Sequence, residues 1–433
     1  MCIRDRLGNE RGLPVLFYEG LTCTYRQASD RIHTFVLEGV PDNERAARDR
    51  GLGYAFYLRR RRQDANDTVY RLADRAAAVV TDDHPTFIAA EHNARVPQRI
   101  GVAYFAVDSS CVVPMNCIPK REYAAYTIRP KIHKLLPEYL RPAPETKPAY
   151  RWTAKTPDFH VPVTKENIPE LVASCDIDHS VKPSTAFSGG RTAALRRLDA
   201  FLENNLKRYG QARNDPSAHA TSNLSPYLHF GHISSLEVAL AAKISAEERG
   251  FHAEEFLEEL IVRRELAFNF ARYTSSLEGF EGLPDWARKT MAQHAGDSRV
   301  PCFTPAQLEQ AGTYDPLWNA AQKELLLRGK IHGYYRMYWG KKIIEWTRDY
   351  QEALSVMIHL HDRYALDGRD PNTYTGILWC FGLHDRPWFE RPVFGLIRFM
   401  SFDGMKRKTN TNAYIEEIAA LGRGGSDPVR FDK

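Results

Sequence analysis

The chain contains little cysteine, and its seven cysteines are scattered along 433 residues. They form no CxxC pair and have no histidine partners at the spacing of zinc ligands. A disulfide scaffold and a zinc finger are therefore excluded, and free thiols in a reducing compartment are expected. The sequence also lacks an apolar run of the roughly eighteen residues that span a membrane, and its first residues lack the charged, apolar and small-residue regions typical of a signal peptide. We expect a soluble intracellular protein without a membrane partner.

The chain has no strong excess of charge of either sign. Its formal net charge is +5 and its isoelectric point is about 8.7, which is compatible with nucleic-acid binding but does not indicate it. Hydrophobic residues make up 43% of the sequence, enough for a sizeable core. This length and composition predict one large domain or two domains.

The N-terminal part alternates short apolar runs with polar segments. The runs at residues 14–18, 54–58, 77–81 and 102–107 read as strands, with helical segments between the first three and a loop-rich or helical piece before the last. This order predicts an α/β, Rossmann-like domain with a parallel sheet over residues 1–130. Neither a GxGxxG motif nor a P-loop is present, so the sequence does not identify a ligand for this domain.

Residues 7–12 resemble the end of a helix with a glycine cap, followed directly by a strand. We therefore expect a first helix and strand upstream, so that the parallel sheet lacks its first strand here. On this hypothesis residues 1–6 are not native to the protein.

Residues 131–187 are rich in proline and have little helical periodicity, which predicts an interdomain linker. From residue 188 to 433 the apolar positions recur at helical spacing, as Leu195, Leu198 and Leu202 do. The second domain is therefore predicted to be all-helical.

Two polar patches of the helical domain suggest a site. Residues 221–225 are rich in hydrogen-bonding side chains and precede a proline, an arrangement that suits a pyrophosphate but equally suits simple helix capping. Residues 258–265 place acids and arginines within two helical turns. They form either a surface ion-pair ladder or a partly buried cluster that serves a ligand.

Aromatic side chains dominate two further patches. Trp339 and Trp346 are seven residues apart on one predicted helix, with Trp318 upstream, and such a stripe is either core or a path for electrons to a redox cofactor. In residues 366–408, turns, tryptophans and cations alternate along the chain, a pattern that is typical of binding to phosphates and unstacked bases. A solvated basic loop is the alternative for this stretch.

Nine ordered segments of the chain resemble the class II cyclobutane pyrimidine dimer photolyases, and the likeness extends over about residues 11 to 417. The segments are residues 122–132, 189–198, 213–216, 222–231, 259–266, 315–322, 335–339, 366–372 and 390–398. The resemblance implies light-driven repair of DNA by an electron from reduced FAD, with the damaged bases flipped into a pocket.

The resemblance also implies roles for individual residues around the cofactor. Arg213 and Asp385 would form an ion pair beside the flavin, and Asp367 would approach the flavin ring, with Asp370 as a second candidate. The residues implied to bind FAD are Tyr209, Arg213, Thr221, Ser222, Asn223, Leu224, Ser225, Arg264, Asp367, Asp370, Asn372 and Asp385.

On the substrate side, the resemblance implies that Glu259 hydrogen-bonds the edge of the damaged pyrimidine. Trp318, Trp339 and Trp346 match the electron-transfer tryptophans of the family, which re-reduce the flavin but take no part in repair. The residues implied to contact DNA are Glu259, Arg263, Met337, Trp379, Arg386, Arg398, Lys406 and Arg407.

The chain departs from the family pattern at His361, where the family usually has an asparagine facing flavin N5. An imidazole there can hold or donate a proton, so we expect altered flavin photochemistry. Asn372 is the alternative N5 neighbour if the register differs. The incomplete sheet weakens the expectation of a deazaflavin-type antenna, which some relatives hold in the first domain.

Damaged DNA is the expected partner of a monomeric protein, in the cytoplasm at the nucleoid of a prokaryote or in the nucleus of a eukaryote. Two other functions remain open. One is a cryptochrome-like FAD photoreceptor without repair activity, against which Glu259, Met337 and Trp379 argue. The other is a non-catalytic DNA-binding protein, which would not bind flavin.

Overall fold

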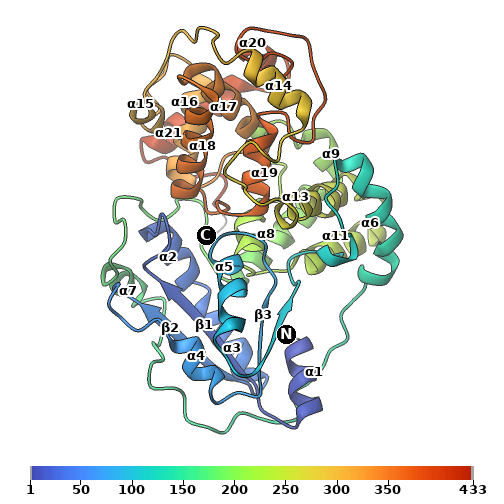
Figure 1. Cartoon of the computed structure of the whole chain (residues 1–433), viewed down its shortest axis with the longest axis vertical. Helices are drawn as coiled ribbons and strands as arrows, with labels where there is room; N and C mark the ends of the chain where they lie inside the picture. The colour runs from blue at the N-terminus through green and yellow to red at the C-terminus, as the bar shows by residue number, and fades with distance from the viewer. Residues whose placement is uncertain (1, 431–433) are drawn as a thin grey trace.

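The structure is a computed structural model, and it describes residues 2–430. An α/β part built from the N-terminal residues packs against a larger helical part (Figure 1). This arrangement confirms the predicted fold class.

The four strands lie where the apolar runs predict them, and each pairs with its neighbour in parallel. They are β1 (Leu16–Thr22), β2 (Gly53–Arg59), β3 (Ala78–Asp82) and β4 (Ala103–Val107). β1 pairs with β2 and β3 pairs with β4, so the strands form two separate pairs. Within residues 2–430 no strand joins β1 to β3.

Five helices accompany these strands. The first of them ends at Arg11 and is followed by Gly12, whose φ of +68° gives the left-handed cap that the sequence predicts. Asp5 of this helix is 1% exposed and accepts a hydrogen bond from Arg50 at 2.6 Å, so residues 2–11 are integrated into the fold. The helices are α1 (Cys2–Arg11), α2 (Asp30–Leu37), α3 (Val40–Asp49), α4 (Thr68–Ala73) and α5 (Phe87–Arg95).

The predicted linker is more structured than its proline content suggests. α6 (Ala125–Tyr139) runs through residue 131, where the linker was expected to begin, and contains two prolines. Ile128 and Ile132 of α6 are fully buried against the helical part, and this packing outweighs the cost of the prolines. Further along, α7 (Ile168–Ala173) and Cys175 pack into the core of β1 and β2.

The helical part begins with α8, and side chains cap several of its helices. Asp315 caps α16 by accepting from the backbone N–H groups of Leu317 and Trp318. The elements of this part are α8 (Arg191–Asn204), α9 (Tyr209–Ala212), α10 (Ser225–His229), α11 (Ser235–Glu248), α12 (Glu254–Leu257), the π-helix η5 (Glu258–Arg263), α13 (Arg264–Arg272), α14 (Asp285–Gln293), α15 (Pro305–Glu309), α16 (Pro316–Arg328), α17 (Gly333–Trp346), α18 (Tyr350–Tyr364), α19 (Pro371–Trp379), α20 (Phe402–Lys406) and α21 (Thr411–Gly422).

Two hydrophobic cores stabilise the helical part. One gathers α16, α17, α18 and α19 around three tryptophans, and the other joins α8, α11 and α13 to α6 and α2. Polar side chains from α10, α17 and α18 and from the turn between α18 and α19 meet between these cores.

The six cysteines at positions 23, 111, 117, 175, 302 and 380 are free thiols, as predicted. Within the described part of the chain, every helix is too short or too polar to cross a membrane.

Candidate active site

Asp367 is the centre of a buried polar cluster. It follows α18 and is 6% exposed. Its carboxylate accepts from Arg336 of α17 at 3.1 Å and from the Ser225 hydroxyl at 2.7 Å. Burial alone would raise the pKa of Asp367, but the cations Arg336 and Lys330 lower it well below the usual range. The site therefore holds a carboxylate anion that is paired with arginine.

His361 lies beside this cluster with no hydrogen-bond partner on either ring nitrogen. The residue is 0% exposed, and its ring packs edge-on against Trp339 with centroids 5.7 Å apart. Burial and the nearby Arg336 lower the pKa of His361 to about 3, so the ring is neutral at pH 7. A neutral buried imidazole offers one donor and one acceptor, and both are free for a ligand.

Asp370 caps α19 and accepts from Asn372, through both its backbone N–H and its side-chain amide, at 2.9 Å. It also lies 3.1 Å from Nδ1 of His229. The side chains of His84, His229 and Asp370 place three potential ligand atoms within 4.8 Å of one another. The helix cap and the contact with His229 are sufficient to explain the position of Asp370, without a metal ion.

Residues 221–224 form a turn that leads into α10 at Ser225, and Asn223 in this turn has a φ of +54°. The Thr221 hydroxyl donates to the Asn223 side chain at 3.4 Å, and Leu224 is buried. A small cavity of about 20 Å³ borders residues 221–223 and the C-terminal residues 428 and 429. α10 has only five residues, so its dipole contributes little to anion binding. An anion at this turn would be bound by hydroxyl and amide groups.

Glu259 of η5 forms an ion pair with Arg213 at 2.5 Å, and the two side chains are about one-third exposed, at 35% and 31%. The Arg213 guanidinium lies over the ring of Tyr209, 5.8 Å from its centroid. Burial and the charge of Glu259 raise the pKa of Tyr209 to about 12. Next to this pair, Glu258 accepts from Arg129 of α6 at 2.7 Å and from Arg263 at 3.1 Å. Together these groups form a partly exposed charged rim.

Three tryptophans form a buried column that begins at His361. Trp339 and Trp318 stack with centroids 6.5 Å apart and an interplanar angle of 2°, and Trp318 meets Trp346 edge-on at 5.6 Å. All three are at most 1% exposed. Tyr314 contacts Trp346 at 5.4 Å and is 61% exposed, so the column reaches the surface.

The stretch after α19 is an exposed basic and aromatic surface. Arg386 and Arg398 both lie over the ring of Trp388, 5.2 and 5.0 Å from its centroid. Phe389 is 89% exposed, which is unusual for a phenylalanine. Lys406 and Arg407 at the end of α20 are exposed as well.

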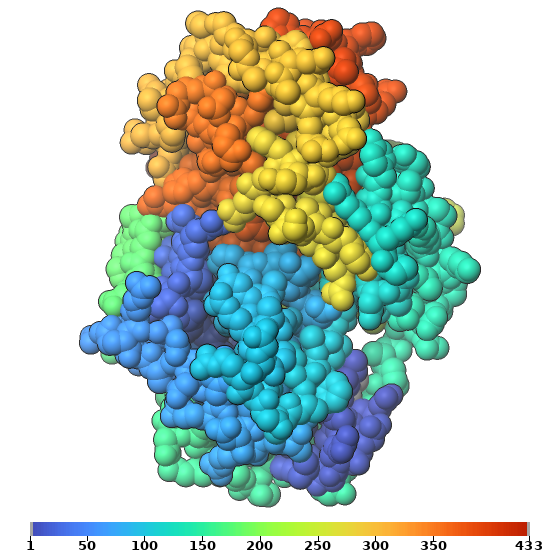
Figure 2. Space-filling view, in the orientation of Figure 1, coloured from blue at the N-terminus to red at the C-terminus, as the bar shows by residue number. Residues whose placement is uncertain are grey.

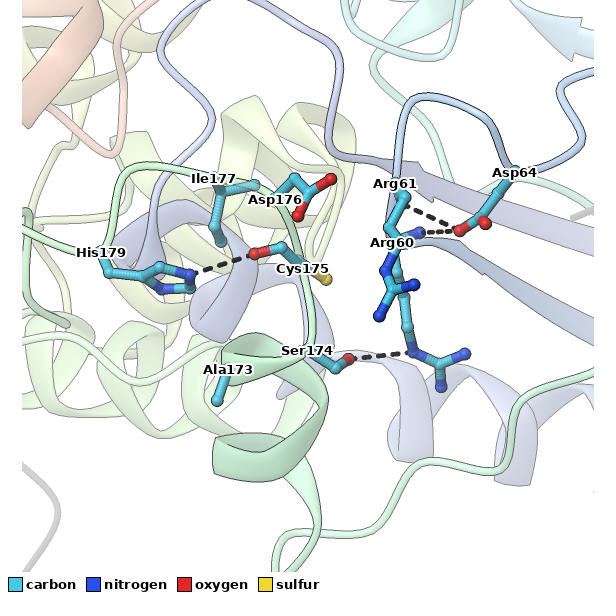
Figure 3. Close-up of a pocket in the computed structure, with 9 residues that line it drawn as sticks. All are labelled: Arg60, Arg61, Asp64, Ala173, Ser174, Cys175, Asp176, Ile177 and His179. Atoms are coloured by element: carbon cyan, nitrogen blue, oxygen red, sulfur yellow. Dashed lines mark hydrogen bonds between the residues drawn. The ribbon is translucent and has the colours of Figure 1, made fainter.

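A separate cavity of about 810 Å³ lies at the carboxyl end of β2 in the α/β part (Figure 3). Arg60 donates to the Ser174 hydroxyl at 3.0 Å, and Asp64 accepts from the backbone N–H groups of Arg60 and Arg61. The lining is polar and contains no aromatic ring other than His179. It does not have the apolar walls that a flat chromophore needs.

The chain was compared with known proteins. No protein-family model matches it. It is 39% identical over 424 residues to the deoxyribodipyrimidine photo-lyase of Methanothermobacter thermautotrophicus, covering 94% of this chain and 88% of that one. It is also 39% identical over 427 residues to the enzyme of the same name from Arabidopsis thaliana, with coverages of 96% and 84%. The chain belongs to the deoxyribodipyrimidine photo-lyase family.

Solved structures agree with this photo-lyase assignment at the level of the fold. A class III photolyase from Agrobacterium tumefaciens superimposes with a TM-score of 0.69 at 16% identity, covering 99% of this chain and 86% of that chain. A cryptochrome from Synechocystis superimposes with a TM-score of 0.70 at 15% identity, with coverages of 97% and 86%.

One geometric prediction for this photo-lyase is wrong. Arg213 was expected to pair with Asp385, but it pairs with Glu259. Asp385 instead accepts from the backbone N–H of Arg386 at 2.8 Å and from the Trp388 indole at 3.2 Å. The carboxylate of Asp385 thus shapes its own loop, since a short polar side chain readily caps nearby backbone groups.

The other predicted site residues divide between the buried cluster and the surface. Ser225, Asp367 and His361 meet near Arg336. Arg264 is 8% exposed and donates to the backbone carbonyl of Ser110 at 2.6 Å, away from the Glu259 pair. Met337 within α17 and Trp379 at the end of α19 are both partly buried.

Sequence reasoning missed Arg336 and Lys330 as members of the buried cluster. Both lie in the segment around Trp339, whose aromatic residues are its clearest feature, and no sequence motif links them to Asp367. It also missed Arg129, whose role depends on α6 packing against η5.

Proposed function

We propose that this protein repairs cyclobutane pyrimidine dimers in DNA by light-driven electron transfer from FAD, as a class II photolyase. The observation that carries the proposal is the similarity to enzymes named deoxyribodipyrimidine photo-lyase over 94% and 96% of the chain. The nine sequence segments that resemble class II enzymes support the subtype, and two of them contain Asp367 and Arg336.

The residues between the two helical cores fit a flavin dinucleotide. His361 offers an unused donor and acceptor, and Arg336 has an unpartnered Nε inside the protein. Lys330 is a second cation beside Asp367, with Glu324 as a further nearby acid, so the cluster offers positive charge to phosphates or to a flavin anion. Residues 221–225 would supply hydroxyl and amide donors to the pyrophosphate. Bound FAD would supply the one-electron chemistry.

Around the proposed FAD site, protein residues place charged groups in fixed positions and exclude water. The Arg336–Asp367 pair fixes a positive group next to His361, and burial keeps bulk solvent away. Asp370 and Asn372 hold the start of α19 in place, which keeps the turn after α18 rigid. Arg264 and Tyr209 have protein partners and would act by packing and positioning.

On the DNA side, we propose that Glu259 binds the edge of the flipped pyrimidines. Its carboxylate is partly exposed and is oriented by the ion pair with Arg213. It can therefore leave Arg213 and accept a hydrogen bond from a base N–H without becoming an unpaired buried charge on the way. Met337 and Trp379 would pack against the flipped bases. The cations Arg263, Arg386, Arg398, Lys406 and Arg407 would contact the strand around the lesion.

The tryptophan column supports a second role, the re-reduction of oxidised flavin. Successive rings lie within 6.5 Å of one another from Trp339 to Trp346, a nearly continuous aromatic path out of the site. A purely structural core would have no need of the surface contact through Tyr314.

For the α/β part we propose no antenna. The cavity in Figure 3 has a polar lining that does not fit a deazaflavin ring, so no step in the proposed reaction uses it. We further propose that the protein acts as a monomer in the compartment that contains the DNA, which size-exclusion chromatography and cell imaging test.

Repair is tested by purifying the protein in the dark and illuminating it with an oligonucleotide that contains one thymine dimer, in the presence of a reductant. We expect thymine absorbance to recover in the light and not in the dark. Glu259→Gln should lower repair about tenfold or more, since it removes a charged contact to the substrate, while Glu255→Gln, a change at an exposed carboxylate of α12, serves as the nearby control. Protein that binds FAD and DNA but never restores thymine absorbance would contradict the proposal and favour a photoreceptor.

A further inference from the structure

Two exposed tyrosines at the start of α6 form a pair that we call the tyrosine platform. Tyr126 is 66% exposed and Tyr123 is 47% exposed. Their rings contact each other edge-on, with centroids 6.4 Å apart. The mutual contact limits the motion of both rings, so a flat ligand would find a surface that is already ordered.

The platform is connected to the proposed DNA-binding rim on two sides. Arg129, one helical turn after Tyr126, binds Glu258, which precedes Glu259 in η5. On the other side, the backbone carbonyl of Tyr123 accepts from Nδ1 of His384 at 2.6 Å. Burial lowers the pKa of His384 to about 4, so the ring is neutral and this single N–H fixes its orientation.

His384 begins the loop that carries the exposed basic and aromatic surface after α19. The platform, the charged rim at Glu258 and Glu259, and the Arg386 loop therefore form one continuous strip. In Figure 1, α6 lies at the edge of the helical part beside α11 and α13, and Figure 2 shows that its side chains are accessible from outside.

The charge around the platform favours an anionic partner. Lys120 and Arg121 precede it and Lys134 follows it, and all three are exposed. The acidic Glu122 between them is buried and paired with Lys131, so it does not cancel these charges at the surface. Aromatic rings flanked by cations are the arrangement that binds unpaired nucleic acid.

We propose that the tyrosine platform stacks on a base next to the flipped lesion. This inference rests on the proposed function. Flipping a dimer leaves its neighbours without stacking partners, and an exposed ring pair on the rim can replace the lost contact. The occupant is thus a base of the damaged DNA, not a second protein.

The test measures binding in the dark, without photochemistry. Fluorescence anisotropy compares a labelled duplex with one thymine dimer, the same duplex undamaged, and the single strand. Tyr126→Ala should weaken binding to the dimer duplex about fivefold or more, since stacking contributes roughly 1–3 kcal/mol per base. Tyr126→Phe, which keeps the ring, should stay within about twofold. Tyr150→Ala is the matched control, because Tyr150 is 46% exposed and lies near α1.

A second readout reports stacking directly. A 2-aminopurine placed beside the dimer, first on one side and then on the other, should be quenched by the wild-type protein and by Tyr126→Phe but not by Tyr126→Ala. Unchanged affinity and quenching in Tyr126→Ala would refute the platform. So would an equal loss in Tyr126→Phe, or a change in self-association with DNA binding unaffected.

Failure of the proposed function would look different. Wild-type protein that binds damaged and undamaged duplexes equally well would contradict dimer recognition. The platform would then still be judged by whether Tyr126→Ala weakens binding to the single strand, and it would be refuted if it does not.

Discussion

The buried pair of Asp367 and Arg336 allows a sharp test of the cluster at the centre of the site. Asp367→Asn leaves Arg336 and Lys330 close together without the carboxylate between them, and Arg336→Met leaves Lys330 as the cation beside the carboxylate. The side chains of Asp367 and Arg336 are 7% and 18% exposed, so solvent screens their interaction only weakly.

Removing one partner from a buried pair costs about 3–5 kcal/mol. We expect Arg336→Met near the lower end because Lys330 and Ser225 still stabilise the carboxylate, and Asp367→Asn nearer the upper end because two cations then face each other. The double substitution removes both charges, so it should cost about 2 kcal/mol less than the sum of the two single effects. The exposed pair Arg348 and Glu352, with Arg348 77% exposed, should give a coupling of only about 0.3–0.5 kcal/mol.

Each pair is tested by a double-mutant cycle, which consists of the wild type, the two single variants and the double variant. The assay is urea unfolding of these proteins at pH 7, monitored by circular dichroism and by tryptophan fluorescence. Coincident transitions in the two signals show that unfolding is two-state, so that a free energy of unfolding can be derived from the curves. Because the folded-state pKa of Asp367 is lowered, its contribution is fully present above about pH 4 and is lost as the pH falls further. Additive single effects at pH 7, or a coupling no larger than that of the surface pair, would refute the buried ion pair.

Three further predictions concern other buried groups. Trp339→Phe should abolish photoreduction of bound flavin yet leave repair by chemically reduced protein intact, and loss of both with FAD still bound would contradict this. His361→Asn should change the spectrum reached on photoreduction, and an unchanged spectrum would show that the imidazole does not act on the flavin. Burial lowers the pKa of Lys341, which donates to the Cys380 carbonyl, to about 8. The folded state therefore binds fewer protons than the unfolded chain between about pH 8 and 10.4, so wild-type stability should rise over that range. Unfolding of Lys341→Met should lack this rise, and an equal rise in the variant would assign it to another group.

Much of the fold could be predicted because apolar periodicity and turn residues act locally. The four strands and the cap at Gly12 lie where the sequence places them. α6 was missed because Pro130 and Pro137 argue against a helix, whereas the burial of Ile128 and Ile132 depends on residues far along the chain. Local signals do not contain that long-range packing.

Sequence motifs single out candidate site residues, but they do not predict which of these residues pair with one another. The resemblance implies an ion pair between Arg213 and Asp385, yet Arg213 pairs with Glu259. Which carboxylate an arginine meets depends on the relative placement of η5, α9 and the loop after α19. Sequence spacing carries no information about that placement.

The division of the sheet into two strand pairs has a consequence for motion. A two-stranded ribbon is marginally stable by itself, so each pair depends on what covers it. The β1–β2 pair is well covered, since most of β2 is buried, but β4 is largely exposed and Phe105 is 43% exposed. The backbone amides of β3 and β4 should therefore exchange with solvent deuterium sooner than those of β2 or of the tryptophan-rich helices. On this view the protein has a rigid half that performs the chemistry and a corner that opens locally without disturbing it.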